Sequence, residues 1–246
     1  MLVAMQRGAL VVVLAGCGFH GAETSDARTI DAAIDAPDGA ASTFCNPIDG
    51  LVACYEFEGN TNDATTNHLD ALATNVVFVA GQVGNAILLA SNSAVNVAAS
   101  SKFDVAQLTI EAWVNPTMLP AATRASVVLA VNGQYALWIN DNGTLSCDLH
   151  GATRVTTAPT AVVATMAWNH VACTYDGAIG HIYINGGLAG SHNGNGDLTM
   201  NAPAMAIGSN SPSGSPLIGT IDQLRLMSVA RGGPEICSDA GQTSCP

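Results

Sequence analysis

The sequence predicts an all-β fold, either a two-sheet sandwich or a barrel, and three observations predict it. From Leu51 onward, short runs of apolar residues alternate with polar residues in a period of two. Turn-forming pairs such as Asn132-Gly133 and Asn142-Gly143 separate these runs. No ten-residue window carries a strong helical period, so strands account for nearly all of the expected secondary structure.

The predicted strands are short and closely spaced. Ile110 and Val114 fall on one face of the run 108–115, whereas Trp113 falls on the other. A helical turn or two is expected only at Pro234–Gly241. The predicted strands are Leu51–Phe57, Asn85–Ala90, Val95–Ala98, Leu108–Asn115, Ser126–Val131, Gln134–Ile139, Thr144–Leu149, Asn169–Tyr175, His181–Asn185 and Gly219–Met227.

The charge balance excludes one class of partner. The 246 residues include 7 Lys and Arg against 19 Asp and Glu, which gives a net charge of −12 at pH 7. A protein that binds nucleic acid through phosphate contacts needs clustered basic residues, and this sequence has no such cluster. The hydrophobic fraction of 48% also excludes disorder along the whole chain. We therefore expect an acidic folded protein with no nucleic-acid partner.

Residues 1–17 are typical of an export signal. Arg7 provides a positive start, and Ala9–Ala15 is apolar but too short to span a bilayer. The segment ends in Leu14-Ala15-Gly16-Cys17, which resembles a bacterial lipobox and implies a lipid anchor on Cys17. Glycine after the cysteine favours the outer membrane, on its periplasmic or its surface side. An ordinary cleaved signal with a chance cysteine is the alternative.

Residues 18–44 form a predicted tether, and the folded domain is predicted to comprise residues 45–246. The tether is rich in Ala, Asp, Thr and Gly, and its acidic side chains face only Arg28. Such a segment repels itself and stays extended. An acidic motif recognised by a receptor is the alternative interpretation.

The remaining cysteines agree with export. An even number of cysteines in an exported chain predicts up to three disulfides. A zinc cluster is the competing interpretation, but the sequence has no Cys-x-x-Cys pair and its spacings match no zinc module. The cysteines other than Cys17 are Cys45, Cys54, Cys147, Cys173, Cys237 and Cys245.

Six segments follow one another in an order that resembles a known family. They are LVACYEFEGNTNDATTNHLDA (51–71), VAGQVGNAILL (79–89), LTIEAWVNP (108–116), WNHVACTYDG (168–177), IYINGG (182–187) and LIGTIDQLRLMSVA (217–230). Together they resemble LamG-like jelly-roll domains of the concanavalin A-like lectin/glucanase superfamily. The resemblance covers residues 51–236 and implies a two-sheet antiparallel jelly-roll sandwich. It implies fold more specifically than activity, because this fold carries lectins, hydrolases and adhesion modules.

The resemblance also implies how the cysteines pair. In the family's topology, the strands around Cys147 and Cys173 lie close together in one sheet with both sulfurs toward the apolar side, which implies a Cys147–Cys173 disulfide. The first and last strands lie side by side and antiparallel, and this brings the other four cysteines near one another. Those four allow three connectivities, and the sequence does not choose between them.

The carboxylates do not form a glycosidase pair. Glycosidases of this superfamily carry a Glu-x-Asp-x-Glu strand, because retaining hydrolysis needs two carboxylates about 5–5.5 Å apart. Glu56 and Glu58 are only two residues apart, and Glu111 stands alone. His170 matches a position that is commonly histidine in the family, which implies a structural role through hydrogen bonding within the sheet. We therefore expect a non-catalytic protein.

One loop has the composition of a calcium site. Glu58 and Asp63 frame a run of oxygen-bearing side chains after the first predicted strand, and Ca²⁺ prefers several oxygen ligands. Related domains often hold a structural calcium between the first and last strands, and Asp222 is the matching position on the last strand. The resemblance thus implies a Ca²⁺ site at Glu58, Asp63 and Asp222. A polar turn beside a solvated aspartate is the alternative.

Two tryptophans are candidates for ligand binding. Trp113 and Trp138 each alternate with apolar neighbours, so one side of each strand faces away from the core. An exposed indole provides a plane for a sugar ring, whereas a tryptophan covered by a loop is the alternative. The long polar loops Gly151–Thr157 and Ser209–Pro216 are further places for binding residues.

The expected function is a cell-envelope lipoprotein whose LamG-like domain binds glycan or an envelope or extracellular protein without catalysis. A structural or adhesive envelope module with no soluble ligand is the second hypothesis. A glycoside hydrolase with an unfamiliar carboxylate pair is the third.

Overall fold

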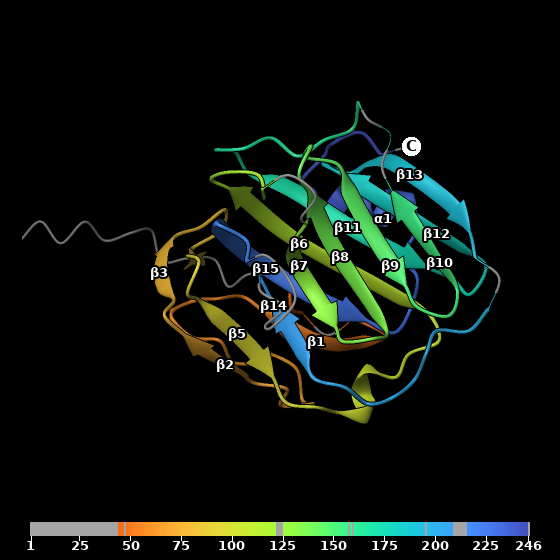
Figure 1. Cartoon of the computed structure of the whole chain (residues 1–246), viewed down its shortest axis with the longest axis horizontal. Coiled ribbons are helices and arrows are strands. Elements are labelled where there is room, and N and C mark those ends of the chain that lie inside the picture. The colour runs from red at the N-terminus through yellow and green to blue at the C-terminus, as the bar shows by residue number, and fades with distance from the viewer. Residues whose placement is uncertain are drawn as a thin grey trace, which may run out of the picture. The chain divides into compact units, whose positions relative to one another are not determined.

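The computed structural model describes residues 44–46, 48–121, 125–156, 158, 160–194, 196–208 and 216–245. The predicted signal peptide, Cys17 and the tether up to residue 43 lie outside these residues. Two antiparallel β-sheets stack face to face in the described part (Figure 1). This arrangement confirms the predicted all-β jelly-roll sandwich. None of the helices in these residues has the length and apolar character that a membrane span requires.

The described strands form one sheet of eight and one of seven. The larger has the order β13-β12-β11-β6-β15-β4-β3, with β1 also paired to β15. Its strands are β1 (Leu51–Tyr55), β3 (Val77–Ala80), β4 (Asn85–Leu89), β6 (Leu108–Pro116), β11 (Asn169–Tyr175), β12 (Ile179–Ile184), β13 (Gly187–Asn193) and β15 (Gly219–Met227). The smaller has the order β10-β9-β8-β7-β14-β5-β2. Its strands are β2 (Ala71–Thr74), β5 (Ala94–Val97), β7 (Ala125–Val131), β8 (Tyr135–Asn140), β9 (Leu145–Leu149), β10 (Thr153–Thr156) and β14 (Met205–Ile207).

The period-two pattern places the core between the sheets. In β6, Ile110, Ala112 and Val114 are fully buried in the main hydrophobic cluster, and the alternating Glu111 and Trp113 point to the outer face. Two buried tyrosines fix loops over the open ends of the sandwich: the hydroxyl of Tyr55 donates to the carbonyl of Leu69, and that of Tyr135 to the carbonyl of Phe103. The core is therefore apolar throughout, with polar groups at its rim.

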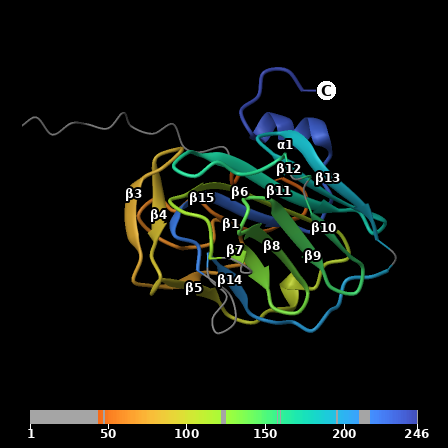
Figure 2. The same cartoon turned by 45° about the horizontal axis from the view of Figure 1, so that its top comes forward.

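Two helices complete the described fold. A single 3₁₀ turn, η1 (Ser101–Phe103), precedes β6, and α1 (Gly233–Asp239) follows β15, close to the helical turn predicted at 234–241. Ile236 of α1 packs against Ala172 and Tyr183, so the helix covers the outer face of β11 and β12 (Figure 2).

The predicted hairpin turns occur where the sequence places them. Gly133, Gly143, Gly177 and Gly186 have φ between 79° and 95°, the left-handed region that glycine enters without a Cβ clash. Each follows Asn or Asp and joins two strands that pair with each other.

Five strands of the described structure were not predicted from the sequence. The strands β2, β3 and β10 have four residues and β14 has three, too few to show a period of two. The edge strand β13 is longer, but its sequence GLAGSHN is mostly exposed and has no apolar face. The loop prediction for Gly151–Thr157 is wrong, because β10 lies within it and pairs with β9. Most of the other predicted loop, 209–215, lies outside the described residues.

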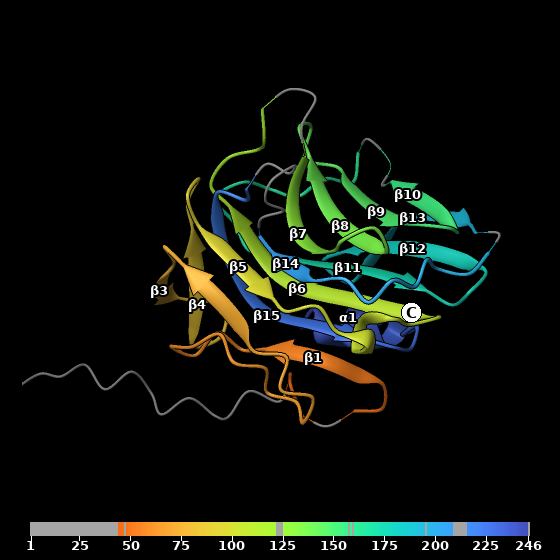
Figure 3. The ribbon, with the colours of Figure 1, turned by 60° about the horizontal axis from the view of Figure 1, so that its bottom comes forward.

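Three disulfides cross-link the described part of the chain. Cys147 and Cys173 are bonded, as the family resemblance implies, and both lie in the main core. Their strands do not share a sheet, contrary to expectation: β9 belongs to the seven-stranded sheet and β11 to the eight-stranded one, so the bond joins the two layers. The other four cysteines pair locally, as Cys45–Cys54 and Cys237–Cys245. The first and last strands, β1 and β15, do lie side by side and antiparallel (Figure 3).

The inter-sheet disulfide provides a stability test. Replacing Cys147 and Cys173 together by alanine opens a link across a sequence separation of 26, which lowers the free energy of unfolding by about 3–4 kcal/mol on the chain-entropy account. The Cys45/Cys54 double variant, with a separation of 9, loses about 1 kcal/mol less by the same account. Chemical denaturation of both variants measures the difference. Peptide mapping of the non-reduced protein should find Cys147 linked to Cys173. A peptide that links Cys147 to a cysteine other than Cys173 would contradict the disulfide between the two sheets.

Candidate functional site

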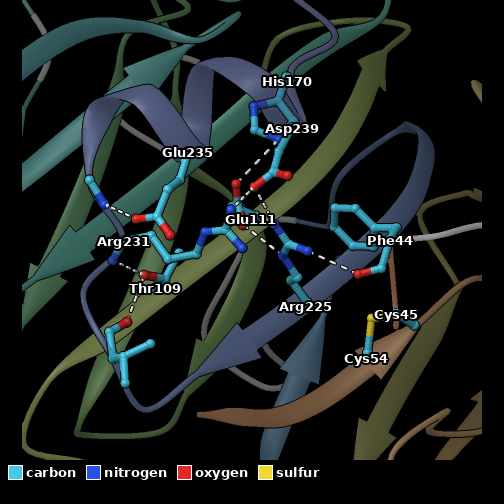
Figure 4. A network of polar contacts seen from close by, with 12 residues as sticks. Phe44, Cys45, Cys54, Thr109, Glu111, His170, Arg225, Arg231, Glu235 and Asp239 are labelled. Atoms are coloured by element: carbon cyan, nitrogen blue, oxygen red, sulfur yellow. Dashed lines mark hydrogen bonds and ion pairs between the residues drawn. A yellow bond between two sulfur atoms is a disulfide. The ribbon is translucent and has the colours of Figure 1, made fainter. Parts of the chain in front are cut away.

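The outer face of the eight-stranded sheet carries a buried polar cluster (Figure 4). Glu111 on β6 pairs in register with Arg225 on β15, and His170 on β11 lies opposite Trp113 of β6. A bulge between Asp222 and Arg225 adds one residue to β15, so that both side chains face outward although they are three positions apart. Without this extra residue, the alternation would turn Arg225 into the apolar core.

Arg225 joins three parts of the chain. Its Nε lies 2.7 Å from Oε2 of Glu111, its Nη1 donates to the carbonyl of Phe44 at 2.9 Å, and its Nη2 contacts Asp239 of α1. The guanidinium also lies over the Phe44 ring, 4.2 Å from the ring centre. Arg231 makes a second contact with Asp239, at 2.6 Å. We call Phe44, Glu111, Arg225, Arg231 and Asp239 the Arg225 clasp.

Burial controls protonation in this region. It raises the pKa of Glu111 from 4.5 to about 7, against the opposing effect of the Arg225 charge. Burial, followed by repulsion from Arg225 and Arg231, lowers the pKa of His170 from 6.5 to about 3. His170 is therefore neutral at pH 7, with Nε2 3.6 Å from Oε1 of Glu111 and its ring edge against Trp113.

The titratable groups at the centre of this cluster are fully buried. Glu111 and His170 are both 0% exposed, so no substrate reaches either group in this conformation. The hydrogen bonding expected of the His170 side chain is wrong, because neither ring nitrogen makes a hydrogen bond within the described residues. In sequence Glu111 stands alone, and its partners lie far from it along the chain. The available signal is Arg225 itself, since a charge inside the apolar run LRLM (224–227) requires buried partners.

The three predicted calcium ligands do not gather into one cluster. Within the described residues, no group of three or more His, Cys, Asp or Glu side chains is arranged to hold a metal. Asp63 is engaged within its own loop, where its two oxygens accept hydrogen bonds from the backbone of Cys54 and Leu69 and from both the backbone and the hydroxyl of Thr65. It acts as the organiser of the β1–β2 connection.

Glu58 and Asp222 both accept hydrogen bonds from the β3–β4 hairpin. Asp222 accepts from the amide of Val83 at 2.9 Å, and Glu58 accepts from the backbone and the side-chain amide of Asn85. Burial, with a smaller contribution from the charge of Glu58, raises the pKa of Asp222 to about 7, against the lowering effect of the backbone amides of Val83, Gln223 and Gln82. The second oxygen of Asp222, Oδ1, is buried without a partner in the described structure. This pair of carboxylates is the part of the predicted site that the fold brings together.

The two candidate tryptophans lie on different sheets. Trp113 projects from the outer face of the eight-stranded sheet beside His170, whereas Trp138 projects from the outer face of the seven-stranded sheet. They therefore cannot form one binding site.

Trp138 lies on a flat surface of small residues. Ala206, Ala130 and Ala136 are successive cross-strand partners on β14, β7 and β8, and the last two pack against Trp138. The indole is partly exposed, but its Nε1 is buried without a hydrogen bond, so the exposed part is ring carbon.

Polar groups border this surface. Asp148, opposite Ala136, forms an ion pair with the exposed Arg154 at 3.0 Å. Ser146, opposite Trp138, is linked to the Asn140 amide at 2.9 Å. We call Ala130, Ala136, Trp138, Asp148 and Arg154 the Trp138 platform.

The comparisons identify the family. The model of the concanavalin A-like lectin/glucanases superfamily, in its Laminin_G_3 form, matches residues 89–237. The chain belongs to this superfamily. No curated protein was found to match it.

Solved structures support the same fold at low sequence identity. Domain 4 of the extracellular arabinanase AbnA from Geobacillus stearothermophilus, in complex with arabinotriose, aligns with 22% identity and a TM-score of 0.66, over 78% of this chain and 98% of that one. The binding domain of Paraclostridial Mosquitocidal Protein 1 aligns with 18% identity and a TM-score of 0.68, over 78% and 52%. The binding domain of Botulinum Neurotoxin DC, in complex with SialylT, gives 12% and 0.59, over 80% and 52%. The aligned region thus spans about half of the toxin binding domains.

The shifted pKa values of Glu111 and His170 predict that the free energy of unfolding depends on pH. Glu111 takes up a proton on folding between pH 4.5 and about 7, so its contribution to stability falls as pH rises through that window. His170 has the opposite sign, because its lowered pKa makes stability rise between pH 3 and 6.5. Glu111→Gln removes the first contribution, and the free energy of unfolding should then rise more steeply from pH 4.5 to 6.5 than in the wild type.

Urea denaturation across this pH range measures the two slopes. Glu56→Gln, a glutamate outside the clasp, is the control and should follow the wild-type profile. Parallel profiles for wild type and Glu111→Gln would show that Glu111 does not titrate in this window.

Proposed function

We propose that the chain is an exported lipoprotein whose folded domain binds glycan without catalysis. Three disulfides in the described part indicate an exported protein. The superfamily contains lectins and glucanases, and the similar structures include the binding domains of two toxins. The Glu111 carboxylate of the clasp is fully buried, which supports binding without catalysis.

The observation that carries this proposal is the Trp138 platform. Three small alanines lie side by side on neighbouring strands, and the partly exposed carbon face of Trp138 packs over two of them. The C–H face of a sugar ring packs on such a surface, and its hydroxyls reach the Asp148–Arg154 pair at the border. A hydrophobic surface with a few fixed polar groups is the common pattern of a small-molecule site.

Trp138→Ala tests the platform. Loss of the stacking surface should reduce glycan binding at least tenfold, equivalent to about 1.4 kcal/mol, because aromatic contacts supply most of the apolar area of such a site. A glycan array with the full-length protein identifies the ligand, and calorimetry with that ligand measures the loss.

Trp113→Ala is the matched control, since it removes an indole from the other sheet. It should leave glycan affinity unchanged. Equal losses in both variants, or full binding by Trp138→Ala, would exclude the platform as the site.

The lipid anchor is a separate part of the proposal and lies outside the described residues. Cys17→Ser removes the only thiol in the lipobox-like sequence, so the protein should move from the membrane fraction to the soluble fraction. Fractionation followed by immunoblotting measures the distribution. Replacing Gly18 by alanine, next to the cysteine, is the control and should remain in the membrane fraction. A Cys17→Ser protein that still pellets with membranes rules out the anchor.

We further propose a structural Ca²⁺ held by Glu58 and Asp222. The unpartnered, buried Oδ1 of Asp222 is the feature that fits a hard cation, because a buried carboxylate oxygen without a donor is otherwise costly. A bound cation would also offset the repulsion between the two carboxylates. Asp63 does not fit this site, since its oxygens already accept four hydrogen bonds.

The contrast between Asp222 and Asp63 tests this site. Calcium should raise the melting temperature of the wild type in a concentration-dependent way, because it binds only the folded state. Asp222→Asn should lose most of this response. Asp63→Asn should melt earlier with or without calcium, because it weakens acceptors of buried backbone amides, but should keep the response. Identical wild-type melting curves in EDTA and in millimolar calcium would contradict the site.

A further inference from the structure

A pocket of ≈ 270 Å³ lies between α1 and the turn that joins β12 to β13. Its walls include Asn185 and Gly186 of the turn, the following Leu188, and Gln242 and Ser244 of the C-terminal segment. It is separate from the Trp138 platform, because it belongs to the outer side of the eight-stranded sheet, where α1 lies (Figure 2).

Two features hold the walls in place. A Cβ at Gly186 would lie 2.9 Å from the Cα of Cys237, so only glycine allows the turn to approach α1 this closely. The Cys237–Cys245 disulfide ties the C-terminal segment into a loop over the same place. The pocket therefore exists before any ligand binds, which lowers the entropic cost of binding.

The polar groups of the pocket are neutral. None of the described residues that line it carries a charge. The nearby carboxylates of α1 are engaged elsewhere: Glu235 caps the helix at the amide of Gly232, and Asp239 belongs to the Arg225 clasp. In an acidic chain, an uncharged pocket favours an uncharged ligand.

Asn185 presents an oriented donor. Its Oδ1 accepts from the amide of His170 at 2.9 Å, which fixes the side chain and leaves Nδ2 as the group available to a ligand. The exposed side chains of Gln242 and Ser244 add an amide and a hydroxyl. Leu188, 60% exposed, adds an apolar surface. Donors, acceptors and one apolar wall together match a ring with hydroxyls at its edge and C–H groups on its face.

We propose that this pocket binds one neutral sugar unit, as a second subsite of the glycan-binding domain; this inference rests on the proposed function. Its volume lies just below the range of roughly 300–1,000 Å³ that is typical of sites for drug-sized ligands, which suits a single ring. A charged ligand would find no opposite charge among these walls, and a purely apolar one would bury the Asn185 amide without a partner. A ligand this small binds with a Kd on the order of 1 mM.

Saturation-transfer NMR with the full-length protein tests the pocket, with glucose, galactose, mannose, N-acetylglucosamine and arabinose as probes. Asn185→Asp keeps the acceptor for His170 but replaces the donor Nδ2 by a charged oxygen. Asn142→Asp is the matched control, because Asn142 also precedes a turn glycine and accepts from a backbone amide, that of Thr144. Thermal unfolding checks that both variants are folded.

We expect at least one sugar to show transfer in Trp138→Ala, where the platform is lost. This transfer should fall at least tenfold when Asn185→Asp is added to Trp138→Ala and stay unchanged when Asn142→Asp is added instead. Transfer that persists in the Trp138→Ala/Asn185→Asp double variant, or that is absent from Trp138→Ala for every sugar, overturns the pocket. If the glycan array still shows binding that depends on Trp138, the pocket fails while the proposed function stands. If array binding does not depend on Trp138 but sugar transfer depends on Asn185, the platform fails and the pocket stands.

Discussion

The buried guanidinium of Arg225 is the constraint on which the outer face of the larger sheet depends. A charge at 2% exposure is costly to bury, and here the sheet, the start of the domain and the last helix each supply one partner. Removal of any one partner leaves part of the buried guanidinium without its hydrogen bond, so each of the three parts of the chain stabilises the other two. The Cys45–Cys54 disulfide begins one residue after Phe44 and holds the start of the domain against β1, which keeps the Phe44 carbonyl within reach of the arginine.

The outer faces of the two sheets are covered to different extents. On the larger sheet, α1 and Phe44 cover polar groups and close much of the outer face. The smaller sheet has no helix in the described residues to cover it, and Trp138 lies on its outer face over alanines of the middle strands. The Cys147–Cys173 bond connects the two layers through the core, so the smaller sheet is held to the larger one from its inner side.

The sequence predicts strand content well where a period of two has room to appear. Strands such as β6 and β11 have alternating apolar positions over seven or more residues, and the Asn-Gly and Asp-Gly pairs locate their turns. The edge strand β13 has no such signal, because solvent surrounds it and nothing selects apolar residues there.

The clasp could not be predicted, because its charges lie far apart along the chain and meet only through strand order and a bulge at Gln223, a non-glycine residue with φ of 45°. The placement of Cys147 and Cys173 shows the same limit. The resemblance implied the correct pair but placed both cysteines in one sheet. An apolar-facing cysteine has the same sequence pattern whether its partner lies across the core or on a neighbouring strand. The Glu58–Asp222 pair could be predicted only because the family places the first and last strands side by side.

The distribution of basic residues determines which ligands suit this surface. In the described part of the chain, Arg225 and Arg231 are committed to the clasp, and Arg154 pairs with Asp148 at the border of the Trp138 platform. Lys102 is the remaining basic side chain there, and it lies on η1. Anionic ligands therefore meet few uncompensated positive charges on a protein with net charge −12. Neutral glycans incur no such repulsion, and their binding depends instead on shape, stacking and hydrogen bonds, which are the features that the platform and the Asn185 pocket provide.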